Sequence, residues 1–315
     1  PESHAGDQVE LDIGPFDVIN LETEGFNADF TNSEVDATQP VGVFVGSEAS
    51  DAPTYTNYAA RQCCADHLEE QLIPDSALGL NFVVAHQPSR THALNQASAD
   101  GQPLVAEGDE PEWVRIVALS GDPTHIMTTL PSPDDNFMLD QHNDVILKTT
   151  TDFQIKADRP VSVVDVLASQ EVTGIPSTYP GGDPSLIVVP PSEQYRRDYV
   201  FLTPDTYAFN FVEIVAQKGA NILLDGASLS DTGCTSSDVP ELAGSDANAT
   251  AWVTYGCQLS FPTVTRGPHV TVSPGTRNTG AHSLVSDTPI GIVVSGFDSF
   301  VGYAYVGGLN LDVLN

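Results

Sequence analysis

The segment QIKADRPVSVVDVL (154–167) decides the fold. It reads as a polar strand, a short turn, a proline and then an alternating apolar strand rich in valine. SLVSDTPIGIVVSG (283–296) repeats this order with Pro289 in the place of Pro160, and EVDATQPVGVFVGS (34–47) repeats it again. Because proline has no N–H group and a fixed φ, it suits the first residue of a strand after a tight turn. Each segment therefore predicts a strand, a turn and a second strand.

A second pair of similar segments lies between these three. VRIVALSG (114–121) matches VEIVAQKG (212–219) at five of eight positions. Short strands rich in Val and Ile, bounded by Gly, Pro, Asn and Asp, recur along the chain, and helical periodicity is nearly absent. We predict an all-β fold of tandem antiparallel β-sandwich units related by an internal repeat, with one or two short helices. The predicted units are 1–157, with N-terminal acidic strands, and 158–315, with a C-terminal hairpin.

Composition limits the partners. The chain has 315 residues, is 40% hydrophobic and carries a net charge of −32. So acidic a surface repels nucleic acid and anionic membranes, and its acidity suits either a solubility coat or divalent-cation binding. The sequence contains no run of about 18 apolar residues, so we expect no membrane insertion. Pro1 is an unusual natural start, and we expect a removed leader or a fragment.

The stretch CCADHLEEQL (63–72) contains two adjacent cysteines, a histidine and three carboxylates, which are residue types found in metal and catalytic sites. Asp66 and Glu69 have the spacing of a helix-capping pair, and Leu68 and Leu72 would form an apolar stripe. We therefore predict a short capped helix here. His67 with a neighbouring cysteine supplies too few ligands for zinc.

The four cysteines predict disulfides, as in secreted proteins. Cys234 and Cys257 bracket a polar loop, and a bridge between them would stabilise by roughly 3 kcal/mol in the loop-entropy model. That pairing leaves Cys63 bonded to Cys64 as its consequence. The alternative is two crossed bridges that join the halves of the chain.

A weak metal candidate lies in DDNFMLDQHND (134–144). Asp140, His142 and Asp144 alternate, so they would share one face of an extended strand. Calcium would accept the carboxylates, whereas zinc or nickel would prefer the imidazole. The alternative is a solvated turn with an exposed strand face. We expect no cofactor, and calcium is the one ion left open.

Candidate ligand contacts lie in two places. Arg196 and Arg197 stand together in SEQYRR, and Tyr303 and Tyr305 alternate with glycine near the C-terminus. Arginines suit an anionic glycan or protein partner, and exposed aromatic rings stack on sugars. The alternatives are local ion pairs for the arginines and core packing for the tyrosines. Asn248 begins an N-glycosylation sequon.

Four stretches carry a family resemblance: CCADHLEEQLIPDSALGLNFVVA (63–85), GDPSLIVVPPSEQYRRDYVFLTPDTYAFNFVEIVA (182–216), GAHSLVSDTPIGIVVSGF (280–297) and GYAYVGGL (302–309). They resemble the IgGFc-binding protein N-terminal domain family. The resemblance covers most of the chain, from about residue 40 to 309, and brings no catalytic residues with it. It implies a secreted or cell-surface recognition or adhesion module that is not an enzyme.

Two other functions stay open on the sequence alone. One is a structural subunit of an extracellular filament or matrix, which exposed strand edges would serve. The other is a metal-dependent extracellular hydrolase that uses the carboxylates of 134–144 or His67. We expect an extracellular protein or glycan, or a further copy of the chain, as partner. The doubled cysteines and the acidity suggest a bacterial protein, secreted or on the cell surface.

Overall fold

The computed structural model describes residue 4 and residues 6–119, 121–244 and 249–315. Its contacts divide the chain into residues 1–30 and residues 31–315. In the described part of the first unit the chain forms turns and contains neither strand nor helix, and the first strand of the described chain begins at Phe44. The sequon residue Asn248 lies outside the described residues.

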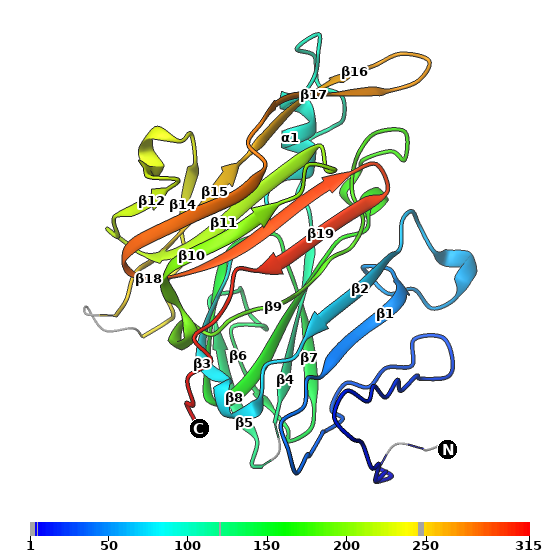
Figure 1. The fold of residues 1–315 in the computed structure, drawn as a ribbon, viewed down its shortest axis with the longest axis vertical. Coiled ribbons are helices and arrows are strands. Elements are labelled where there is room, and N and C mark those ends of the chain that lie inside the picture. Colours follow the sequence, from blue (N-terminus) through cyan, green and yellow to red (C-terminus); the bar gives the residue numbers. More distant parts are fainter. Residues whose placement is uncertain (1–3, 5, 120, 245–248) are drawn as a thin grey trace. The chain divides into compact units, whose positions relative to one another are not determined.

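A seven-stranded antiparallel sheet forms the first half of the second unit (Figure 1). Its strands are β3 (Gly79–Val84), β4 (Glu112–Ala118), β5 (Thr124–Thr128), β6 (Asn136–Leu139), β7 (Asp144–Thr149), β8 (Phe153–Leu167) and β9 (Leu186–Val188). The long strand β8 pairs with β3 and β5 along its first half and with β4 and β9 along its second half. One strand thus crosses from one layer to the other.

An eight-stranded antiparallel sheet follows. Its strands are β10 (Arg196–Thr203), β11 (Phe209–Gln217), β12 (Ile222–Leu224), β13 (Ala227–Ser228), β14 (Thr235–Asp238), β15 (Trp252–Gln258), β18 (Gly280–Asp298) and β19 (Val301–Val306). Here β18 pairs first with β10 and β12 and then with β11 and β19. The prediction of an all-β fold built from antiparallel sheets is confirmed.

The two large sheets share one pairing plan. The pairs of β8 with β3, β4, β5 and β9 correspond to those of β18 with β10, β11, β12 and β19. The outer pairs β4–β7 and β5–β6 likewise correspond to β11–β15 and β12–β13. The similar segments 114–121 and 212–219 begin in β4 and β11, which are equivalent strands in this plan.

Two of the three repeated prolines lie inside the long strands and not at their first residues, whereas Pro40 of the segment 34–47 lies before β1 and outside any strand. Pro160 is within β8 and Pro289 is within β18. At both places the pairing with the neighbouring strand is irregular: the register shifts between Gly79 and Asn81 in β3, and between Arg196 and Asp198 in β10. A residue without an N–H group is tolerated there because the ladder is already interrupted. The prolines therefore mark where each long strand changes partners.

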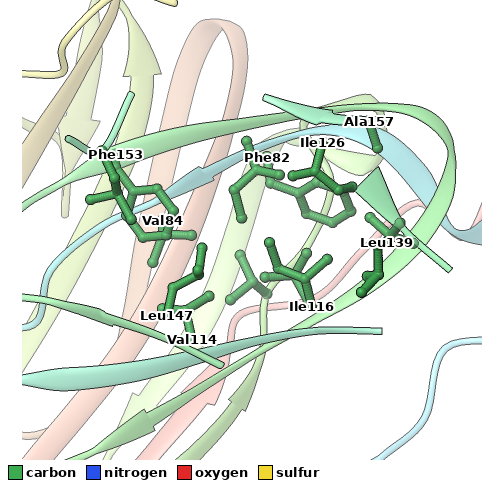
Figure 2. Close-up of a cluster of buried hydrophobic side chains, with 14 of the residues drawn as sticks. Phe82, Val84, Val114, Ile116, Ile126, Leu139, Leu147, Phe153 and Ala157 are labelled. Atoms are coloured by element: carbon green, nitrogen blue, oxygen red, sulfur yellow. The ribbon is translucent and has the colours of Figure 1, made fainter. Parts of the chain in front are cut away.

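Each large sheet encloses its own apolar core. In the first, alternate residues of β8 meet β3, β4 and β5, with Phe153, Phe82 and Ile116 fully buried among them (Figure 2). In the second, β18 contributes Leu284, Ile290, Ile292 and Val294. Alternation with a period of two places every second side chain of a strand in such a core.

Strand β11 is buried on both faces. Val212 and Ile214 belong to the second core, whereas Val215 belongs to a smaller apolar cluster with Val83 of β3 and Ala85, the residue that follows β3. The two sheets are therefore joined through apolar contacts along β11.

Two hairpins and short helices complete the unit. The hairpins are β1 (Phe44–Ser50) with β2 (Asp66–Gln71), and β16 (Ser260–Thr265) with β17 (Thr271–Arg277). Helix α1 (Arg90–Gln96) begins after Ser89, whose Oγ accepts a hydrogen bond from His92 N. Short 3-10 turns are η1 (Tyr58–Ala60), η2 (Asp75–Ala77), η3 (Gln170–Thr173), η4 (Ser192–Gln194) and η5 (Leu229–Asp231).

The predicted helix over CCADHLEEQL is wrong, because this stretch forms strand β2. Its residues pair antiparallel with β1, from Phe44 opposite Gln71 to Ser50 opposite Asp66. The carboxylate of Asp66 accepts a hydrogen bond from its neighbour His67 N and caps no helix. The acidic spacing is compatible with a helix cap, but Asp66–Gln71 pairs with β1, and a short helix of one or two turns is marginal without such pairing.

Candidate functional site

The arginines proposed as ligand contacts begin β10. Arg196 Nη2 lies 3.5 Å from Asp198 Oδ2, and its guanidinium carbon lies 5.9 Å from the centre of the Tyr199 ring. Arg197 is exposed. Both remain accessible to solvent, but Arg196 already has a carboxylate and an aromatic ring as neighbours.

The hydroxyl groups of the two tyrosines of β19 form hydrogen bonds with other residues of the chain. Tyr303 Oη donates to Asn210 Oδ1 at 2.7 Å. Tyr305 Oη donates to the carbonyl oxygen of Leu202 at 2.6 Å and accepts from Leu202 N at 3.0 Å. Both rings are partly buried against the second core. Tyr305 thus covers backbone groups of β10, which pairs only with β18 among the described strands.

The metal candidates do not share a face. Asp140 and His142 lie in a turn closed by a hydrogen bond from Asn143 N to the Asp140 carbonyl. Asp144 begins β7 and its carboxylate lies 2.8 Å from Arg115 Nε. Throughout the described residues, no group of three His, Cys, Asp or Glu side chains has a geometry that could hold a metal ion.

The disulfides join Cys63 to Cys64 and Cys234 to Cys257. The first lies at the end of the loop between β1 and β2. The second connects the segment before β14 to β15, and Cys257 is buried in the second core.

His282 belongs to a buried hydrogen-bond chain. Its Nδ1 lies 2.8 Å from Asp225 Oδ2 and its Nε2 lies 3.0 Å from Thr203 Oγ1. The order hydroxyl, imidazole, carboxylate is that of hydrolytic triads. Here Thr203 and the His282 side chain are each 1% exposed, so no substrate can reach the hydroxyl. The chain instead ties the turn after β12 to β10 and β18.

A buried ion pair anchors α1 where the two sheets meet. Arg90 Nε lies 3.3 Å from Glu110 Oε2, and the guanidinium donates to the carbonyls of Gly181 and Ala168. Glu110 Oε1 also accepts from Thr91 N at 2.8 Å. Burial works to raise the pKa of Glu110, but the Arg90 charge and these hydrogen bonds outweigh it and lower the pKa.

Two further carboxyls next to this pair have a raised pKa. Burial raises the pKa of Glu112 to about 8, although its Oε1 accepts a hydrogen bond from Gln87 N. Burial, followed by the nearby Glu112 charge, raises the pKa of Asp165 well above its ordinary value. Glu112 Oε2 and Asp165 Oδ1 have no hydrogen-bond partner among the described atoms, and His86 Nε2 lies 3.7 Å from Glu112 Oε1.

A third buried carboxyl faces them from the second sheet. Glu213 of β11 is 5% exposed, and its Oε1 has no hydrogen-bond partner among the described atoms. Burial raises the pKa of Glu213 well above its ordinary value, and the charges of Asp152 and Glu112 add to this. Burial thus raises the pKa of all three acids, Glu112, Asp165 and Glu213, where the two sheets meet.

The space beside these acids is small. A cavity of about 30 Å³ is lined by residues that include His86, Arg90, Glu112, Asp183 and Tyr303. One water needs roughly 10–15 Å³ of such volume, whereas ligand pockets take several hundred. The joint can hold water and protons, but it offers no room for a sugar or a peptide side chain.

The sequence reasoning missed these acids, although a signal was present. Glu112 precedes Val114 and Ile116 at a spacing of two, and Asp165 follows Val161 and Val163 in the same way. An acid in register with core residues of a strand is expected to be buried.

No helix within the described ranges combines the length and apolar character that a membrane crossing requires. The fold and its sites define an antiparallel β-sandwich protein with two apolar cores. Glu112, Asp165 and Glu213 are buried where its two large sheets meet, and we call this set the buried acidic joint.

The comparison with protein families gives the identity at family level. The family model described as IgGFc binding protein matches residues 1–296, so the chain belongs to the IgGFc-binding family. No curated protein matches it. One solved structure with some likeness is the lectin of Pleurotus ostreatus in its apo form, at 11% identity. The match covers 72% of this chain and 84% of the lectin with a TM-score of 0.19, which is too low to carry an argument.

Proposed function

We propose that this chain is a secreted or cell-surface binding module that recognises an extracellular protein or glycan and catalyses no reaction. The membership in the IgGFc-binding family over residues 1–296 carries this proposal. The buried acidic joint and the His282 chain supply no accessible nucleophile and no space for a substrate, which supports recognition over catalysis. The net charge of −32 favours partners with neutral or basic surfaces.

The test is a binding screen with the whole chain. The labelled protein is applied to an array of purified extracellular proteins, which includes the Fc fragment of IgG, and to a glycan array. The proposal expects saturable binding to at least one member at physiological salt, unchanged by a chelator. Absence of binding on both arrays at micromolar concentration would contradict it.

A further inference from the structure

The loop of residues 51–65 between β1 and β2 has an unusual composition for this chain. Its tip, TYTNYAA (54–60), contains no charged residue, although 17% of the chain is charged. Figure 1 shows this loop extending beyond the ends of β1 and β2, with the η1 turn within it. Depletion of charge with exposed aromatic residues is typical of the central part of protein interfaces.

The tip presents a large aromatic side chain on an ordered turn. Tyr58 is 72% exposed. Asn57 Oδ1 accepts a hydrogen bond from Ala59 N at 3.0 Å and so begins the η1 turn. The Arg61 guanidinium lies 6.0 Å from the centre of the Tyr58 ring and pairs with the Asp51 carboxylate. Tyrosine, arginine and asparagine are the side chains that binding loops favour.

Both ends of the loop are fixed to the segment around η3. Ala52 N donates to Ser169 Oγ at 3.0 Å, and Ser169 N donates to the Ala52 carbonyl at 2.8 Å. Cys63 N donates to Glu171 Oε2 at 3.2 Å, and Glu171 N donates to the Cys63 carbonyl at 2.9 Å. A loop held at its base loses less conformational entropy when it binds.

We propose that residues 54–61 form the contact surface for a folded protein partner, with Tyr58 seated in an apolar depression of that partner. This rests on the proposed function and names its surface. A projecting loop that is depleted of charge and carries an exposed aromatic ring suits a concave protein surface. A second copy of this chain is the wrong partner, because two molecules of net charge −32 repel each other.

Three variants test the surface on the protein that binds most tightly in the array. Tyr58→Ala removes the ring, Tyr58→Phe keeps it, and Val200→Ser changes a side chain of β10 that is 77% exposed. Tyr58→Ala should weaken the affinity at least about tenfold, as expected of an interface hot spot. Tyr58→Phe should stay within about threefold and Val200→Ser should have no effect. All three should melt at the wild-type temperature because the changed side chains are exposed.

The outcomes separate the two proposals. Wild-type binding to a protein that Tyr58→Ala leaves unchanged would overturn the contact surface alone. Binding confined to glycans, or self-association without another partner, would also overturn it. Absence of any wild-type binding would overturn the proposed function, and the contact surface with it.

Discussion

Single residues at the joint between the sheets determine how the protein responds to pH. Glu112 and Asp165 occupy core-facing positions of β4 and β8, and Glu213 faces them from β11. A buried carboxyl is tolerated more readily in its neutral form, because burial of an unpaired charge costs more free energy than burial of a neutral polar group. The alternation of the strands gave enough information to predict burial of Glu112 and Asp165. It could not reveal that they lie beside Glu213, because that contact depends on how the two sheets pack.

The first prediction concerns Glu112→Gln. The folded chain keeps the Glu112 proton up to about pH 8, whereas the unfolded chain releases it near the ordinary pKa of 4.5. The folded state therefore binds more protons between these values, and its stability falls as pH rises from about 5 to 8. The glutamine side chain cannot lose a proton, so in the variant the free energy of unfolding should fall less between pH 5 and pH 8, by an amount on the order of 3 kcal/mol. Urea unfolding at pH 5 and pH 8 measures it.

The control is Glu107→Gln, which changes a carboxyl that is 57% exposed. It should leave the pH dependence as in the wild type. If the free energy of unfolding changed equally with pH in Glu112→Gln and in the wild type, the raised pKa of Glu112 would be contradicted.

At the scale of elements, the sequence predicted the positions of the strands well, but it did not predict which strands pair with one another. The Pro-centred segments and the pair of similar segments located β8, β18, β4 and β11. The stretch 63–72 misled because its acids suit a helix cap, while the strand that pairs with it ends at Ser50, across a 15-residue loop. Local spacing contains no information about such a partner.

The second prediction compares the two disulfides. The bond between Cys234 and Cys257 spans a sequence separation of 23, whereas Cys63 and Cys64 are adjacent. A bridge restricts the unfolded chain by an amount that rises with the logarithm of the length of the closed loop, so Cys234→Ala with Cys257→Ala should cost roughly 3 kcal/mol. Cys63→Ala with Cys64→Ala should cost far less. Thermal unfolding of the two double variants gives the comparison, and an equal loss would contradict the loop argument.

At the scale of the whole molecule, two groups of strands share one pairing plan and meet along β11. The internal repeat in the sequence agrees with this plan, and an origin by duplication stays a prediction. The division into 1–157 and 158–315 also stays a prediction, although its boundary falls within strand β8. The sequence could not fix a boundary because the repeated motif lies in the strand that crosses between layers, and not at an end of a unit.

The third prediction is that both cores unfold together. Phe153 fills the first core and Leu284 the second, each 0% exposed. Strand β11 belongs to the second sheet and packs against β3 of the first. Phe153→Ala and Leu284→Ala should therefore each lower the free energy of unfolding of the whole unit by about 3 kcal/mol, and each variant should show one transition at a lower temperature. Scanning calorimetry measures this. Two separate transitions, with only one moved by each variant, would show that the groups fold independently.

The measurement that tests the account most directly is hydrogen–deuterium exchange of the chain with and without its tightest partner from the arrays. The account predicts slower exchange in residues 51–65 when the partner is bound. Protection confined to β10 and β19 would contradict the loop as the contact surface and favour Arg196, Arg197, Tyr303 and Tyr305 in its place. Unchanged exchange throughout the chain at saturating partner would contradict the claim that this protein acts by specific recognition.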